Sequence, residues 1–159
     1  MEMLTNLDMV IAAKSATFAL PEVKRGVVAI AGALPRIVRT IGRQRAMEMA
    51  LTGRAVSASE AFSWGFVNAV TEDTPAEAPI LSRPVVKKAL EYAAMITENS
   101  PDSVIVSREG IKLGWESLGA EEASRLLQES WGKRLNEGEN IKEGGKFIAT
   151  DFCGLGKRD

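Results

Sequence analysis

The fold of this chain is decided by residues 16–70, which read ATFALPEVKRGVVAIAGALPRIVRTIGRQRAMEMALTGRAVSASEAFSWGFVNAV. The stretch opens with a short apolar run, ATFAL (16–20), that stops at Pro21, as expected of a short strand in a buried sheet. Two amphipathic runs follow, and they end at Gly42 and Gly53 in the way that glycine commonly ends a helix. The order of these signals predicts a mixed α/β chain.

The flanking sequence predicts further short elements. Residues 2–8 are good helix formers, and the apolar run 9–13 is typical of a buried strand. Ser57 with Glu60 three residues later predicts a capped helix, and the run 66–70 predicts one more strand. Isolated pairs of short strands are marginally stable in water, so we expect these strands to pair with strands from elsewhere or with another copy of the chain.

The later part of the sequence predicts helices. A proline-bearing stretch of small and acidic residues, 71–84, reads as a loop. Beyond it, apolar residues recur at helical spacing in three amphipathic segments, about 85–98, 101–116 and 120–136. We therefore expect three parts, namely a core over 1–72 that carries the candidate site, a linker over 73–84, and a helical oligomerisation region with a tail over 85–159.

Composition removes several classes of partner. The 159 residues carry a net charge of −1 with the two signs interspersed, which gives no electrostatic case for nucleic acid or for an anionic membrane surface. No apolar run has the length of a membrane span, and the first ten residues lack the features of a secretion signal. We expect an intracellular protein, without a distinction between cytoplasm, mitochondrion and peroxisome.

Histidine is absent from the sequence, and this absence restricts the chemistry more than any other count. It excludes histidine-activated serine or cysteine nucleophiles, histidine bases and most zinc sites with nitrogen ligands. The single cysteine, Cys153, cannot form an internal disulfide. Carboxylates, lysines, one tyrosine and backbone amides remain, so catalysis here would be carboxylate acid/base work supported by oriented N–H groups.

The motifs of residues 16–70, taken together, resemble the enoyl-CoA hydratase/isomerase (crotonase) family. In that family, a strand containing Phe is followed by Pro-Glu, by spaced glycines and by a helix that carries an arginine. Leu-Thr-Gly comes next, then a helix with Ala and Gly, and finally Val-Asn. The matching residues here are Phe18, Pro21, Glu22, Gly26, Gly32, Arg36, Gly42, Leu51, Thr52, Gly53, Ala61, Gly65, Val67 and Asn68. So many agreements at fixed offsets make the resemblance specific.

The resemblance extends to the beginning of the chain. Family members place a first glutamate after Gly-Gly-Gly-x, twenty positions before the Pro-Glu glutamate, and reach an Asp six residues later; Glu2, Glu22 and Asp8 fit that register. The resemblance therefore implies the C-terminal half of a crotonase. The implied fold is α/β, the last part of a ββα spiral with few short strands, mostly helical, followed by an α-helical oligomerisation region.

The resemblance also implies an activity and its residues. Glu22 would be the acid/base residue, with a partly desolvated carboxyl, and Glu2 its water-orienting partner, while Gly26, Ala31 and Gly32 would contact the substrate. The implied reaction hydrates 2-enoyl-CoA to 3-hydroxyacyl-CoA, with coenzyme A as part of the substrate and no separate cofactor. Oxyanion donors would come from residues outside this chain, so we expect the 159-residue form to be inactive or impaired. Self-association as a trimer or hexamer is implied as well.

The sequence departs from the family pattern at several positions. Ala29 and Ala33 replace a common proline and a second glycine, and Ala149-Thr150-Asp151 replaces a basic segment, which makes a tail contact to coenzyme A doubtful.

Isomerase or dehydratase chemistry is an alternative to hydration. A non-catalytic truncated or oligomerising remnant of the family is another, and an unrelated all-helical adaptor is a third. The basic pair Lys24-Arg25 and the arginines 36, 39, 43 and 45 are expected to be solvated or to form salt bridges.

Overall fold

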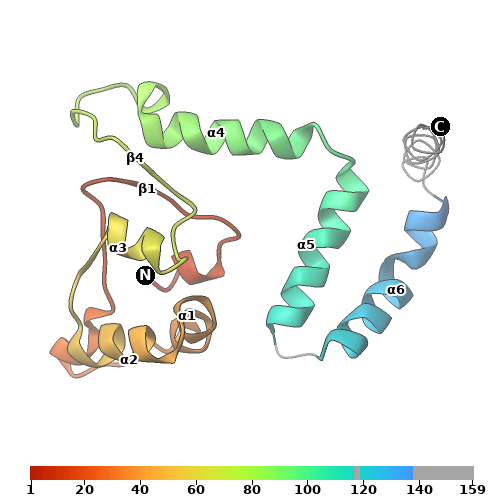
Figure 1. Ribbon diagram of the computed structural model, residues 1–159, viewed down its shortest axis with the longest axis horizontal. Helices are drawn as coiled ribbons and strands as arrows, with labels where there is room; N and C mark the ends of the chain where they lie inside the picture. The colour runs from red at the N-terminus through yellow and green to blue at the C-terminus, as the bar shows by residue number, and fades with distance from the viewer. Residues whose placement is uncertain (117–118, 138–159) are drawn as a thin grey trace, which may run out of the picture. The chain divides into compact units, whose positions relative to one another are not determined.

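The computed structural model of the protein describes residues 1–116 and 119–137. The chain divides into two compact units, Met1–Ala93 and Ala94–Asp159, and the division lies inside helix α4 (Pro84–Thr97). The predicted linker, 73–84, belongs to the first unit and contains the short 3₁₀ helix η3 (Ile80–Ser82). Figure 1 shows the order of the elements along the chain. The predicted tail motifs after residue 137 lie outside the described residues.

Four short strands of the first unit form two pairs. Strand β1 (Ile11–Ala13) runs parallel to β4 (Ala69–Thr71), and β2 (Thr17–Phe18) runs antiparallel to β3 (Val56–Ser57). The strands expected in 9–13 and 16–20 are thereby confirmed, whereas β3 was not anticipated. The strand expected at 66–70 begins only at Ala69, because the amides of Phe66 and Val67 donate to the Ala61 carbonyl at the end of the preceding helix, at 2.9 and 3.2 Å.

The helix expected over residues 2–8 is wrong in type and length. The segment forms a single 3₁₀ turn, η1 (Leu4–Asn6). Thr5 Oγ1 and Asn6 Nδ2 both donate hydrogen bonds to the carbonyl of Glu2, at 2.8 and 2.9 Å. Such local side-chain bonds give the backbone an alternative to a regular helix, and one turn has no neighbouring turns to support it.

After β2 the chain forms a second 3₁₀ helix, η2 (Pro21–Arg25). Three α-helices come later in this unit. They are α1 (Ala33–Ile41), α2 (Arg43–Thr52) and α3 (Ala58–Ser63). Gly42 and Gly53 follow the first two of these helices with φ of 83° and 58°, a backbone conformation that glycine adopts without steric cost. The boundaries predicted from these two glycines are confirmed.

The capping box predicted at the start of α3 is present. Ser57 Oγ accepts a hydrogen bond from the Glu60 amide at 3.2 Å, and Glu60 Oε2 accepts one from the Ser57 amide at 3.0 Å. The backbone and hydroxyl of Ser57, together with Arg54, hold the pKa of the Glu60 carboxyl below its usual value. These bonds satisfy donors that a helix otherwise leaves without partners at its start.

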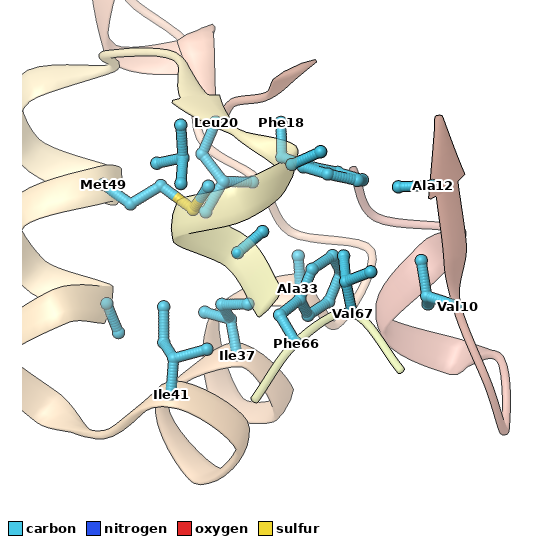
Figure 2. Close-up of a cluster of buried hydrophobic side chains, with 14 of the residues drawn as sticks. Val10, Ala12, Phe18, Leu20, Ala33, Ile37, Ile41, Met49, Phe66 and Val67 are labelled. Carbon is cyan, nitrogen blue, oxygen red and sulfur yellow. The ribbon is translucent and has the colours of Figure 1, made fainter. Parts of the chain in front are cut away.

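One apolar cluster connects these elements, as Figure 2 shows. Helix α1 contributes Ala33, Ile37 and Ile41, which recur every four residues and so share one face. Phe18 of β2 meets Phe66 edge to face, with ring centroids 5.5 Å apart. The strands and helices of the first unit therefore pack around a common core, which positions the loops between them.

The described part of the second unit is helical, as expected. It contains α5 (Pro101–Trp115) and α6 (Ala120–Glu137), which pack against each other and run in opposite directions (Figure 1). Ser100 caps α5 by accepting a hydrogen bond from the amide of Ser103, and Pro101 occupies the first helical position, where its missing N–H costs nothing. Among the described residues, no helix is both long and apolar enough to cross a membrane.

Substitution of Ser57 by alanine should destabilise the first unit by about 1 kcal/mol, the usual cost of losing a helix N-cap. The free energy of unfolding can be measured in urea by the fluorescence of Trp64, in a background where Trp115 and Trp131 are both phenylalanine. Because folding lowers the pKa of Glu60, the difference should shrink as the pH falls below the unfolded-state pKa of glutamate toward its lower folded value. Ser63→Ala, at the other end of α3, is the control, and an equal loss there would contradict the capping role.

Substitution of Gly26 by alanine should also cost about 1–2 kcal/mol, and for a purely conformational reason. Gly26 ends η2 with φ of 69°, and nothing lies within 4 Å of the position that a Cβ would take. Gly114 in α5 is the matched control, since its Cβ position is equally open but its φ is not in the left-handed region. Gly114→Ala should be neutral or stabilising in the same urea measurement, and an unchanged stability of Gly26→Ala would refute the argument.

Candidate active site

The backbone of Glu22 is held from both sides. Leu20, only 2% exposed, anchors the chain just before it, and Pro21 fixes φ at the first position of η2. On the other side the amide of Val27 donates a hydrogen bond to the Glu22 carbonyl at 3.1 Å. The predicted strand end is thus a 3₁₀ turn, and that turn is fixed at both ends.

The carboxyl group of Glu22 has one oxygen in an unusual situation. Oε2 is buried, and it accepts no hydrogen bond from any of the described residues. Leaving a buried acceptor unsatisfied costs about 1–3 kcal/mol, and such atoms in folded proteins call for an explanation. A carboxylate oxygen that is sheltered and uncommitted is suited to transferring a proton to or from another molecule.

The carboxyl group of Glu2 lies against the loop that precedes α1. Its Oε1 accepts a hydrogen bond from the amide of Ala31 at 2.7 Å, across 29 residues of sequence. The Glu2 carbonyl is itself bonded by Thr5 and Asn6, so both ends of the residue are held. Glu2 is therefore held by one tertiary contact and two local ones, although it is the second residue of the chain.

The loop from Gly26 to Gly32 contains the three residues expected to contact a substrate. Gly26 and Gly32 have φ of 69° and 91°, and Gly32 is the N-cap of α1. Arg36 Nη1 donates to the Gly32 carbonyl at 3.2 Å, and a Cβ on Gly32 would collide with that guanidinium. Ala31 offers its amide to Glu2, as described above.

The structure brings some of the predicted residues together directly and others only through the backbone. Glu2 contacts Ala31, which adjoins Gly32, and Glu22 is bonded through its carbonyl to the residue after Gly26. The described residues show no hydrogen bond between the two carboxyl groups. Loop 26–32 is thus the segment that both glutamates share.

Apolar side chains on this loop divide between the core and the surface. Ala29, where the family commonly has proline, is 5% exposed, and Ala33, where it has a second glycine, is fully buried. Val27, Val28 and Ile30 are 55%, 63% and 87% exposed. The two departures from the family pattern therefore fill the core, while the exposed face of the loop offers an apolar surface.

Basic residues near the site have partners that the sequence did not reveal. The aliphatic stem of Lys24 lies over Gly53, where an added Cβ would come within 3.1–3.3 Å of three of its carbons. Arg45 and Arg54 both lie over the ring of Trp64, at 5.6 and 5.3 Å, and Arg54 also pairs with Glu48 and Glu60. Lys24 and Arg45 are nevertheless exposed, as the sequence predicted, so these contacts are made at the surface. For the hydrogen bond from Arg36 to the Gly32 carbonyl, the four-residue spacing of these two residues was the one signal in the sequence.

The arrangement is suited to acid/base chemistry. It combines one uncommitted buried carboxylate oxygen, a second carboxylate fixed by a backbone amide, and an exposed apolar loop between them. In the part of the chain that the structure describes, no three acidic or cysteine side chains lie close enough together to bind a metal ion.

Comparisons with known proteins indicate the family of the chain. Residues 1–146 match the family model described as enoyl-CoA hydratase/isomerase. The chain is 48% identical over 143 residues to a mevalonyl-coenzyme A hydratase of Aspergillus fumigatus, covering 90% of this chain and 50% of that protein. It is also 48% identical to a mevalonyl-coenzyme A hydratase of Beauveria bassiana, over 92% of this chain and 49% of that one.

Solved structures agree as well. A probable enoyl-CoA hydratase/isomerase from Mycobacterium abscessus superposes with a TM-score of 0.78 at 37% identity, covering 94% of this chain and 55% of that one. The chain thus spans about half the length of the relatives it matches, and these matches do not confirm that the half is the C-terminal one. The family predicted from the motifs is nevertheless confirmed: the chain belongs to the enoyl-CoA hydratase/isomerase family.

Proposed function

We propose that the protein adds water to, or removes it from, the C2–C3 bond of an acyl-CoA thioester, with Glu22 as the acid/base residue and Glu2 as the residue that orients water. The observation that carries the proposal is the Oε2 atom of Glu22, which is buried and accepts no hydrogen bond from the described residues. Membership of a family whose printed description is enoyl-CoA hydratase/isomerase supports the choice of reaction.

The chemistry explains why two carboxyl groups are useful. In hydration one O–H bond of water breaks, its oxygen bonds to C3, and a proton is delivered to C2. A carboxylate can take the proton from water and, as the carboxylic acid so formed, deliver it to C2, which restores the carboxylate and adds one water in all, while a second carboxylate holds that water in place. Glu22 is assigned the proton transfer, because its oxygen is sheltered from competing donors.

Glu2 suits an orienting role because one of its oxygens is already fixed. The Ala31 amide holds Oε1 at 2.7 Å, which leaves Oε2 to accept a hydrogen bond from water in one direction. Holding a reactant in a productive orientation replaces much of the entropy cost of bringing it there. Gly26, Ala31 and Gly32 are proposed to line the path of the substrate, with the exposed Val27, Val28 and Ile30 beside its acyl chain.

The substrate proposed for the first assay is mevalonyl-CoA, with crotonyl-CoA as the simpler comparison. Two relatives at 48% identity are named mevalonyl-coenzyme A hydratases. Mevalonyl-CoA carries a hydroxyl on C3, so its dehydration is the reverse of the reaction outlined above. An apolar loop beside the two carboxyl groups suits a branched acyl chain better than a charged one.

A complete site also needs N–H donors for the thioester oxygen, each of which contributes about 10²–10³ in rate. In the relatives, about as much polypeptide again lies outside the match. We propose that the missing donors come from that part, so that the 159-residue chain alone hydrates at close to background rate. Assembly as a trimer or hexamer also remains a proposal, which light scattering of the assayed preparation would test.

Substitution of Glu22 by glutamine should lower kcat about 10²–10⁴-fold, the usual contribution of general acid–base catalysis. The assayed protein is a fusion of this chain with the part of the Aspergillus fumigatus relative that lies outside the match. The two parts are joined in the order in which they occur in that relative. Enoyl-thioester absorbance gives the rate with each substrate. Glu2→Gln should lower kcat less, because glutamine can still accept a hydrogen bond from the Ala31 amide, and the exposed Glu77→Gln is the control.

The outcomes separate the parts of the proposal. A Glu22→Gln variant with kcat within twofold of the parent would remove Glu22 from the chemistry. Hydration at enzyme-like rates by the 159-residue chain alone would remove the need for donors from elsewhere. A folded fusion that acts on neither substrate would favour the non-catalytic alternative.

A further inference from the structure

The start of helix α1 has no ordinary cap. Its N-cap residue is Gly32, which has no side chain, and no side-chain cap bond is present there. An N-cap side chain bonds the amide of the second or third helical residue, and the third residue here is Pro35, which has no amide. The entry of the chain into α1 is therefore fixed in another way.

Arg36 supplies that contact from one turn further along the helix. The side chains of an α-helix are tilted toward its N-terminus, so a residue four positions on can reach back over the N-cap. The guanidinium of Arg36 does so, because Nη1 donates to the carbonyl of Gly32 at 3.2 Å. Arg36 is half-buried, beside the helix face on which Ala33 and Ile37 point into the apolar cluster (Figure 2).

Gly32 leaves room for this guanidinium. A Cβ at position 32 would collide with Arg36 Nη1, so the guanidinium occupies the space that a side chain at 32 would take. The loop before α1 begins and ends with a glycine in a left-handed conformation, Gly26 at φ 69° and Gly32 at φ 91°. Glycine loses more conformational freedom on folding than any other residue, so such a loop needs outside contacts to keep one conformation. Arg36 provides one at the end of the loop.

The conformation of this loop matters because Glu2 depends on it. Ala31, directly before Gly32, donates its amide to Glu2 Oε1 at 2.7 Å. The two local bonds of Glu2, from Thr5 and Asn6, reach its carbonyl and not its carboxyl group. Within the described part of the chain, the Ala31 amide is thus the donor that holds the Glu2 carboxylate.

We propose that Arg36 is a positioning residue for Glu2. Its guanidinium fixes the Gly32 end of loop 26–32, and the loop in turn presents the Ala31 amide to the Glu2 carboxylate. Arg36 acts through the backbone and does not touch the substrate. Its consequence for catalysis rests on the water-orienting role proposed for Glu2, whereas its effect on the Ala31 amide is measurable without any reaction.

A general stabilising role for Arg36 is the alternative. In that case its loss would loosen the whole first unit, and the loop would respond only as one part of it. The amide of Glu60 separates the two roles, because it donates to Ser57 in the same unit but lies in α3 and not in the loop.

The test follows the Ala31 amide by NMR in the ¹⁵N-labelled 159-residue chain. In the parent, the chemical shift of this amide should follow the titration of the Glu2 carboxyl group, and Glu2→Gln should abolish that pH dependence. Arg36→Met removes the charged donor and keeps an unbranched stem. It should weaken the pH dependence and speed hydrogen exchange of the Ala31 amide about tenfold, the effect of about one lost hydrogen bond. The Glu60 amide should exchange as in the parent.

Three further variants act as controls. Arg36→Lys keeps a charged donor and should behave more like the parent than like Arg36→Met. Arg43→Met removes an exposed arginine at the start of the neighbouring helix α2 and should leave the Ala31 amide unchanged. Gly32→Ala places a methyl group where the guanidinium lies and should itself speed exchange at Ala31. Adding Arg36→Met to Gly32→Ala should then have little further effect, since both remove the same contact.

The fusion protein described above extends the test to catalysis. Arg36→Met should lower kcat and leave KM nearly unchanged, because it disturbs the residue that orients water and not the binding of the thioester. In a Glu2→Ala background, the same substitution should change kcat little, because the side chain through which Arg36 acts is then absent.

Three results would overturn the proposal. The first is an Ala31 amide that exchanges and titrates in Arg36→Met as it does in the parent. The second is an equal acceleration at Ala31 and Glu60, which would indicate general loosening. The third is an unchanged kcat in an active fusion whose Ala31 amide has been released. A parent fusion without activity would instead count against the proposed reaction alone, because the coupling of Arg36 to the Ala31 amide is measured on the free chain.

Discussion

Ala33 and Ile37 are fully buried at successive turns of α1, and the segments that position both glutamates are attached to that helix. Loop 26–32 enters α1 through Gly32, and its Ala31 amide holds the carboxylate of Glu2. On the other side α1 packs against α2, which contacts the turn that carries Glu22. Since buried packing is the strongest stabilising contribution that such a small unit has, the geometry of the candidate site depends on one apolar helix face.

Much of the fold could be predicted because its signals are local. Gly42, Gly53 and the Ser57–Glu60 pair act within one helical turn, and each ends or begins a helix where the sequence indicated. The failures involve contacts between distant residues. Strand β3 exists because Val56 pairs with Phe18, and residues 2–8 remain a single turn because Thr5 and Asn6 bond to Glu2. Neither contact leaves a periodic pattern in the sequence.

In the candidate site, too, local motifs could be predicted from the sequence, whereas contacts between distant residues could not. Glu22 was found because Pro-Glu belongs to a continuous motif, but the isolation of its Oε2 atom is a property of packing and has no sequence signature. Glu2 was assigned from spacing alone, and its bond to Ala31 could not be foreseen, because the amide of any residue in the loop would have matched equally well. Membership of the family is confirmed, whereas the roles of these residues, the oligomer and the C-terminal assignment stay predictions.

The stem of Lys24 lying across Gly53 has a consequence for how these two positions can vary in evolution. Gly53 ends α2 in a left-handed conformation, and its missing side chain is also the space in which Lys24 rests. A methyl group at 53 would come within 3.1–3.3 Å of that stem, so the Lys24 side chain would have to shift or become shorter. Gly53 of the Leu-Thr-Gly motif and Lys24, which lies 29 residues earlier and two residues after Pro-Glu, are therefore expected to vary as a coupled pair rather than independently.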